Sequence, residues 1–95
     1  MITVTVDRKQ LILSGHAGYG EAGTDIVCAA VSCLTWNLAR GLEVLTGDGI
    51  RYQGKEGEAE FNLENLSEAG KLLVDSFFIG MCDIAENYPD CVTIN

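Results

Sequence analysis

The feature that constrains the fold most is a repeated order of elements. Two stretches have the 3.6-residue period of a helix, and each follows a pair of short strand-like segments. The first stretch follows Asp25 and the second begins near Ser67. The residues expected on the buried faces recur every three or four positions: Val27, Val31, Leu34, Leu38, Leu42 and Leu45 in the first helix, and Ala69, Leu73, Ser76, Phe77, Gly80 and Ile84 in the second. Each helix therefore has one apolar face to pack against another layer.

The other apolar residues alternate with polar ones, which is the period of a strand with one buried face. Five strands are predicted, at residues 1–6, 11–16, 50–53, 58–63 and 91–94. Polar turns at 7–10 and 54–57 join the first four into two hairpins. The order ββαββαβ predicts one domain, residues 1–95, with an α+β fold. We expect a two-layer sandwich, in which two helices cover one face of a mostly antiparallel sheet.

The charge balance is strongly acidic, with 14 Asp and Glu against 6 Lys and Arg and a net charge of −8. Such a surface repels phosphate backbones, so we expect no direct nucleic-acid partner, whereas a basic peptide would be attracted. No apolar run approaches the ~18 residues that a membrane span needs. The amino-terminal segment lacks the pattern of a signal peptide, and we expect a cytoplasmic protein.

The four cysteines, Cys28, Cys33, Cys82 and Cys91, contain no CxxC pair. With a single histidine in the chain they do not suggest a zinc site, and we expect neither a metal nor another cofactor. Thiols stay reduced in the cytosol, so free cysteines are the expectation.

The lone histidine, His16, and Cys28 flank a glycine-rich loop. Thr24 or Asp25 is the expected cap of the following helix, which places Cys28 in its first turn, where the helix dipole favours a thiolate. A thiolate with a nearby imidazole is a nucleophile with its base, and amides at the helix start, including that of Cys28, suit an oxyanion. Spacing alone leaves a structural role open, because such a dyad is defined by geometry.

The loop itself contains G-x-G-x-x-G at residues 18–23, the pattern of a dinucleotide-binding turn. The short chain and the acidic Glu21 within the turn argue against a nucleotide, and the glycines favour a flap over a bound peptide. Glu21 is placed to meet a lysine of a substrate. Asp25 caps the helix or orients His16, and Ser32 bonds to the thiol, to the substrate or back to its own helix.

Residues 15–17, the glycine-rich loop and the run 23–32 closely resemble the signature of the ribosomal-processing cysteine proteases, the Prp family. The resemblance implies an endopeptidase that removes the N-terminal extension of a large-subunit ribosomal protein, the twenty-seventh in the usual series. It places the catalytic histidine on His16 and the nucleophile on Cys28, and it implies a homodimer. The residues expected to contact the substrate are Gly15, Ala17, Gly18, Tyr19, Gly20, Glu21, Gly23, Asp25 and Ser32.

Two other functions remain open at this point. One is a non-catalytic, ribosome-associated module that binds a peptide, and the other is a thiol redox sensor built on Cys28. Phe78 and Met81 lie off the expected buried stripe, so they are candidates for a subunit interface, with a place in the local core as the alternative.

Overall fold

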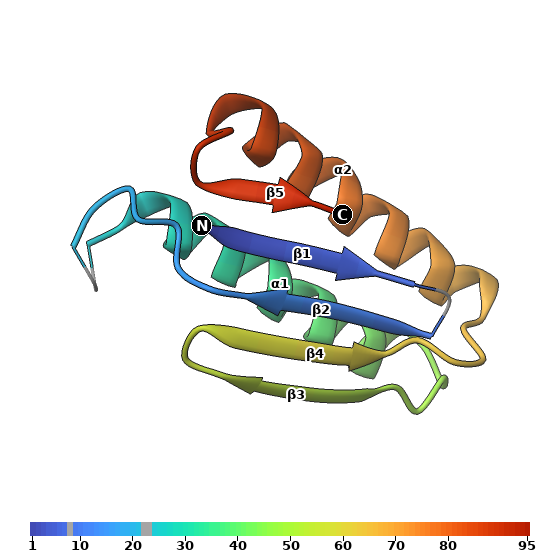
Figure 1. Cartoon of the computed structure of the whole chain (residues 1–95). Helices are drawn as coiled ribbons and strands as arrows, with labels where there is room; N and C mark the ends of the chain where they lie inside the picture. The colour runs from blue at the N-terminus through green and yellow to red at the C-terminus, as the bar shows by residue number, and fades with distance from the viewer. Residues whose placement is uncertain (8, 22–23) are drawn as a thin grey trace.

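The computed structural model describes residues 1–7, 9–21 and 24–95 and confirms the predicted α+β architecture. Two helices lie on one face of a single sheet, and the other face of the sheet is uncovered (Figure 1). The elements are β1 (Ile2–Val6), β2 (Gln10–Ser14), α1 (Ile26–Leu45), β3 (Arg51–Lys55), β4 (Glu58–Asn62), α2 (Glu68–Asn87) and β5 (Val92–Ile94).

The sheet has the strand order β3-β4-β2-β1-β5, and only the pairing of β1 with β5 is parallel. The pairing of β2 with β4 joins the two hairpins, and its register sets Ser14 opposite Glu58. The end of β2 and the turn between β3 and β4 therefore lie at the same end of the sheet (Figure 1). This is also the end at which α1 begins, and several of the candidate site residues lie here (Figure 1).

The core lies between the sheet and the helices, because alternate strand residues point toward the helices. The largest side chains that are fully buried come from three strands and both helices: Phe61, Leu11, Met81, Val4 and Val27. The opposite face of the sheet carries Thr3, Thr5, Glu58 and Glu60, which are polar and at least partly exposed. Alternation therefore predicted the inward face of the strands correctly.

The buried stripes of the helices differ in part from the prediction. In α1, Leu45 is 69% exposed and Leu34 is only half-buried, whereas Thr35 is buried and its hydroxyl donates to the carbonyl of Val31. In α2 the buried residues are Gly70, Val74, Phe77 and Met81, and the predicted Ala69 and Ser76 are exposed. Apolar residues surround α2 on several sides, so periodicity alone did not fix the rotation of the helix about its axis.

The rotation of α2 also determines the burial of Phe78 and Met81, the two residues considered for a subunit interface. Met81 is completely buried in the core, so an interface role for Met81 is wrong. Phe78 is half-buried beside it, with its ring 5.4 Å from that of Phe77 in an edge-on arrangement. Both belong to the core and its margin.

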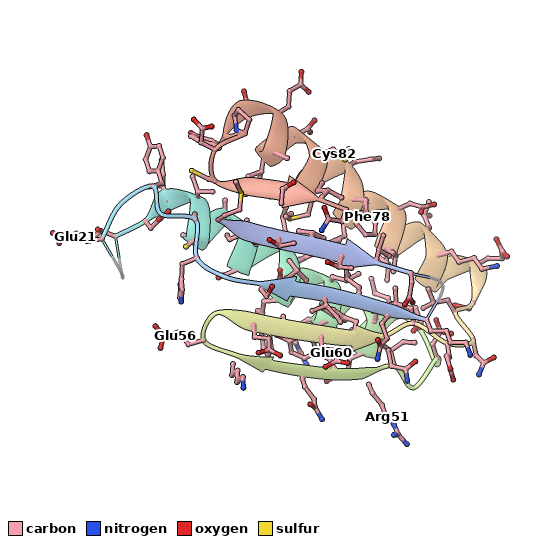
Figure 2. The ribbon with its side chains drawn as sticks, viewed as in Figure 1. Glu21, Arg51, Glu56, Glu60, Phe78 and Cys82 are labelled. Carbon is pink, nitrogen blue, oxygen red and sulfur yellow. The ribbon has the colours of Figure 1, made fainter. Side chains whose placement is uncertain are left out.

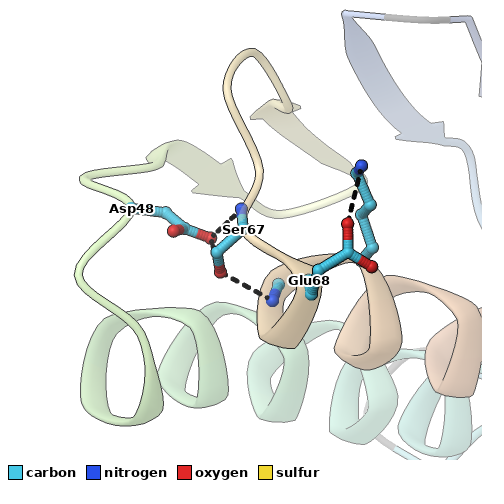
Figure 3. Close-up of polar contacts among 5 residues, drawn as sticks. Asp48, Ser67 and Glu68 are labelled. Atoms are coloured by element: carbon cyan, nitrogen blue, oxygen red, sulfur yellow. Dashed lines mark hydrogen bonds and ion pairs between the residues drawn. The ribbon is translucent and has the colours of Figure 1, made fainter.

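The start of α2 is fixed to the loop that follows α1 (Figure 3). The Ser67 hydroxyl caps α2 by accepting from the Gly70 amide at 3.0 Å. Asp48 accepts from both the amide and the hydroxyl of Ser67, at 3.1 and 2.9 Å. Within the described residues, no helix is long and apolar enough to cross a membrane.

Candidate active site

The start of α1 positions the thiol of Cys28. Asp25 is the N-cap, and its Oδ1 accepts hydrogen bonds from the amides of Val27 and Cys28 at 2.9 and 3.0 Å. A carboxylate is among the best helix caps because it satisfies amides that have no partner within the helix. Cys28 is consequently held in the first turn of α1, where it is half-buried.

The end of β2 positions the imidazole of His16. The strand ends at Ser14, and Gly15 turns the chain with a φ of 99°, a conformation that favours glycine. A Cβ at this position would also collide with the carbonyl oxygen of Met1. His16 then lies just past the end of the strand, in agreement with a position at or just past that end, and its side chain is exposed.

His16 and Cys28 line one cleft of about 470 Å³ at this end of the molecule. The cleft lies between the end of β2, the first turns of α1 and the turn of the β3–β4 hairpin. Of the residues expected to contact a substrate, Gly15, Gly18, Gly20, Asp25 and Ser32 line it. The fold therefore brings a thiol and an imidazole from separate segments to one cleft, whose wall contains both polar and apolar residues.

Asp25 also ties the glycine-rich loop to the helix. Its second oxygen, Oδ2, accepts from the amides of Tyr19 and Gly20 at 2.9 and 3.1 Å. The carboxylate thus receives four backbone hydrogen bonds, which hold the pKa of Asp25 below its usual value despite its burial, and the bond from the Cys28 amide lowers the pKa most. Asp25 is therefore both the helix cap and an anchor for the loop.

The loop places one backbone amide within hydrogen-bonding distance of the Cys28 sulfur. The amide of Ala17, a buried residue, donates to Cys28 Sγ at 3.3 Å. The Cys28 amide, expected to serve an oxyanion, is instead bonded to Asp25, and the Ala29 amide is bonded to the Asp25 carbonyl. The expectation for the Cys28 amide is therefore wrong for this structure, because the cap occupies that donor.

Three of the residues expected to contact a substrate lie outside the cleft lining: Ala17, Tyr19 and Glu21. Tyr19 packs edge-on against Tyr88, with 5.3 Å between ring centres. Glu21 extends away from the molecule at the same end as Glu56 (Figure 2). Gly23, also expected to contact the substrate, lies outside the described residues.

Sequence reasoning missed the contribution of the β3–β4 hairpin. Residues 55–59 line the cleft, and the Gly57 carbonyl accepts from the Gly15 amide at 2.8 Å. Glu56 and Glu58 had the pattern of ordinary solvent-facing acids in the sequence. Only the pairing of β2 with β4 brings them beside His16, and nothing in the local sequence of the hairpin signals this pairing.

The three other cysteines lie outside the lining of this cleft. Cys33 and Cys82 are exposed, Cys91 is buried, and all four thiols are free. Among residues 1–7, 9–21 and 24–95, no group of three or more His, Cys, Asp or Glu side chains is arranged to hold a metal ion.

Comparison with known proteins shows relatives with the same fold. The fold matches the crystal structure of an essential ribosomal processing protease Prp from Staphylococcus aureus, in complex with a covalently linked product peptide, with a TM-score of 0.91 and 26% identity over 100% of this chain and 98% of that one. A crystal structure of the protein SMU.848 from Streptococcus mutans matches with a TM-score of 0.81 and 38% identity, over 99% and 90% of the chains. The ribosomal processing cysteine protease Prp of Mycoplasma pneumoniae is 30% identical over 98% of this chain and 92% of its own.

Fold, site and relatives together define the class of this protein: it is a small α+β cysteine protease. The sequence profile of the cysteine protease Prp matches residues 1–93, nearly the whole chain. The chain belongs to the Prp family, and the resemblance seen in its sequence is confirmed.

Proposed function

We propose that this protease removes the N-terminal extension of a large-subunit ribosomal protein, the twenty-seventh in the usual series, with Cys28 as nucleophile and His16 as general base and acid. The observation that carries the proposal is that the only imidazole of the chain and the thiol at the start of α1 line the same cleft. The relatives with this fold include a ribosomal processing protease with a covalently linked product peptide.

The chemistry follows from these groups. Cys28 Sγ gives its proton to His16 and attacks the scissile carbonyl, forming a carbon–sulfur bond and an oxyanion. His16 then protonates the departing amine as the carbon–nitrogen bond breaks. A water molecule, deprotonated by His16, cleaves the thioester and restores the thiol. No metal or cofactor takes part in this sequence.

The amides of Val27 and Cys28 at the start of α1 are bonded to Asp25, so the proposed mechanism takes its oxyanion donor from another segment. The Ala17 amide already donates to Cys28 Sγ, so it lies close to the place where a carbonyl carbon would bond to this sulfur. We assign Ala17 the role of stabilising first the thiolate and then the oxyanion through its backbone. Asp25 holds the loop that carries this amide and acts as a positioning residue.

The acidic character of the protein suits a basic substrate. Glu56 and Glu58 belong to the hairpin segment that lines the cleft, with the Glu58 side chain on the uncovered face of the sheet, and Glu21 extends into solvent at the same end of the molecule (Figure 2). Only Lys55 offsets them in the cleft lining, and its amine lies 3.8 Å from Glu58. We propose that these carboxylates attract the basic start of the mature ribosomal protein.

The proposal includes a cytoplasmic homodimer that does not bind nucleic acid directly. Apolar side chains exposed on the outer faces of the helices, Trp36, Leu72 and Ile79, are available for contact between subunits. Light scattering on the purified protein measures the subunit number directly.

The test of the protease uses the purified protein and the ribosomal protein with its extension. Wild type is expected to shorten the precursor, and Cys28→Ser and His16→Ala are expected to lose at least 1000-fold in rate, on the order of a lost dyad member. Cys33→Ser is the matched control, because that exposed thiol lies on the same helix outside the cleft, and it is expected to cleave normally. Binding of the precursor without cleavage, or full activity of Cys28→Ser, contradicts the proposal.

A further inference from the structure

The imidazole of His16 rests on the turn of the β3–β4 hairpin at Gly57. A Cβ built on Gly57 would lie 2.9 Å from His16 Nε2, 3.4 Å from Cε1 and 3.7 Å from Cδ2. The ring therefore occupies the space that any side chain at position 57 would need. Gly57 has a φ of 76°, so the turn conformation also favours glycine there.

A backbone bond fixes the hairpin turn relative to the histidine. The Gly15 amide donates to the Gly57 carbonyl at 2.8 Å, one residue before His16. The ladder between β2 and β4 extends up to this bond, with Ser14 opposite Glu58. The turn and the segment that carries His16 are thus one continuous backbone unit.

An exposed imidazole beyond the end of a strand has few neighbours that limit its rotamers. The described hairpin supplies such a limit on one side of the ring. From this contact we infer that Gly57 is a positioning residue, whose bare α-carbon sets the orientation of the His16 imidazole for proton transfer with Cys28. The inference rests on the proposed catalytic function of His16 and Cys28.

A methyl group at position 57 meets the end of a side chain that is free to rotate, so the ring moves and the backbone need not. The charged groups that line the cleft around His16, namely Lys55, Glu56, Glu58 and Asp25, are unchanged by this substitution. Its effect is therefore steric, and a misplacement of about 1 Å is enough to cost about 100-fold in rate.

The experiment compares Gly57→Ala with Gly49→Ala. Gly49 has a similar φ of 66°, but a Cβ there meets no heavy atom within 4 Å. Both variants carry the strain of a left-handed alanine, and similar falls in melting temperature are expected. Only Gly57→Ala is expected to lower kcat, by about 100-fold with little change in KM, because substrate contacts remain.

The single histidine provides a direct second readout. His16 gives the only histidine Cε1–H signal in an NMR spectrum of this chain, and Gly57→Ala is expected to shift that signal while Gly49→Ala leaves it in place. If Gly57→Ala folds poorly, Gly57→Asn brings the same Cβ with a residue that tolerates positive φ. Wild-type kcat in a folded Gly57 variant, or an unmoved His16 signal, overturns the inference.

His16→Ala in the same series separates this inference from the proposed function. Cleavage by His16→Ala at the wild-type rate removes the proposed role of the histidine itself. An inactive His16→Ala beside a fully active Gly57→Ala leaves that role intact and overturns only the role of Gly57.

Discussion

Replacing Asp25 with asparagine separates the two tasks of that side chain. The amide oxygen of asparagine still accepts from Val27 and Cys28, since asparagine is as good a helix cap as aspartate. Its NH₂ group replaces the oxygen that accepts from Tyr19 and Gly20, and a donor facing two donors forms no bond. Asp25→Asn therefore keeps the helix start and releases the loop.

The size of the effect follows from the two bonds that are lost. A hydrogen bond to a charged group is worth about a factor of ten in an equilibrium constant, so two of them hold the loop by up to about 100-fold. Released amides regain water, which reduces the loss to the range of about 10- to 100-fold in kcat/KM. Loss of the negative charge beside Cys28 acts in the opposite direction, because it removes a repulsion between Asp25 and the negative charge that develops during the reaction.

Cleavage of the extended precursor measures the activity of Asp25→Asn, and hydrogen exchange measures the order of its loop. Asp25→Asn is expected to lose exchange protection at the amides of Tyr19 and Gly20 and to cleave more slowly, while iodoacetamide reacts with Cys28 no more slowly than in wild type. Ser67→Ala is the control, because it removes the cap of α2 far from the cleft and is expected to lower stability without lowering kcat/KM. Normal cleavage by Asp25→Asn, with protection lost at both amides, refutes the role of the anchored loop.

Two further outcomes concern stability. Because the pKa of Asp25 is lowered, its hydrogen bonds stabilise the fold above the unfolded-state pKa, near 3.8, and this stability is lost as pH falls through the folded-state pKa. In denaturant titrations between pH 5 and pH 3, the free energy of unfolding should therefore fall less steeply for Asp25→Asn than for wild type. An equal dependence on pH in the two proteins contradicts the assignment. Met81→Ala is expected to cost about 2–5 kcal/mol because Met81 is fully buried, whereas Leu72→Ala, at a side chain that is 70% exposed on the same helix, should change stability by about 0.5 kcal/mol or less in urea titrations. Similar losses of stability in the two variants would contradict the burial of Met81.

The sequence contained enough information for the element order, because each element has its own apolar period and its own stop signals. Asp25, one of the two expected caps, caps α1, α2 begins beside Ser67 as expected, and Pro89 follows the end of α2. The periods gave less information about rotation. In α2, a face shifted by about one residue exchanges Ala69 for Gly70 and buries Met81, and both faces contain enough apolar residues to satisfy the pattern.

The site was predictable where it depended on neighbours in the chain. The cap at Asp25 places Cys28 in the first helical turn, and the end of β2 places His16 at one end of the sheet. The contribution of Gly57 was not predictable, because it arises from a pairing between β2 and β4 across more than forty residues of sequence. Local patterns determine which residues form strands, whereas the order of strands in the sheet depends on the packing of the whole chain.

The hydrogen bonds of the backbone at the start of α1 explain why the glycine-rich loop and the Cys28 thiol depend on each other. A helix start offers free amides to an anion only while no cap occupies them. Here Asp25 takes the amides of Val27 and Cys28, and the donor that reaches the sulfur comes from Ala17 in the loop. The same carboxylate holds that loop by its other oxygen, so the cap removes one donor from the sulfur and, through the loop, supports another. Order in the loop and electrostatic support of Cys28 are therefore coupled through a single side chain.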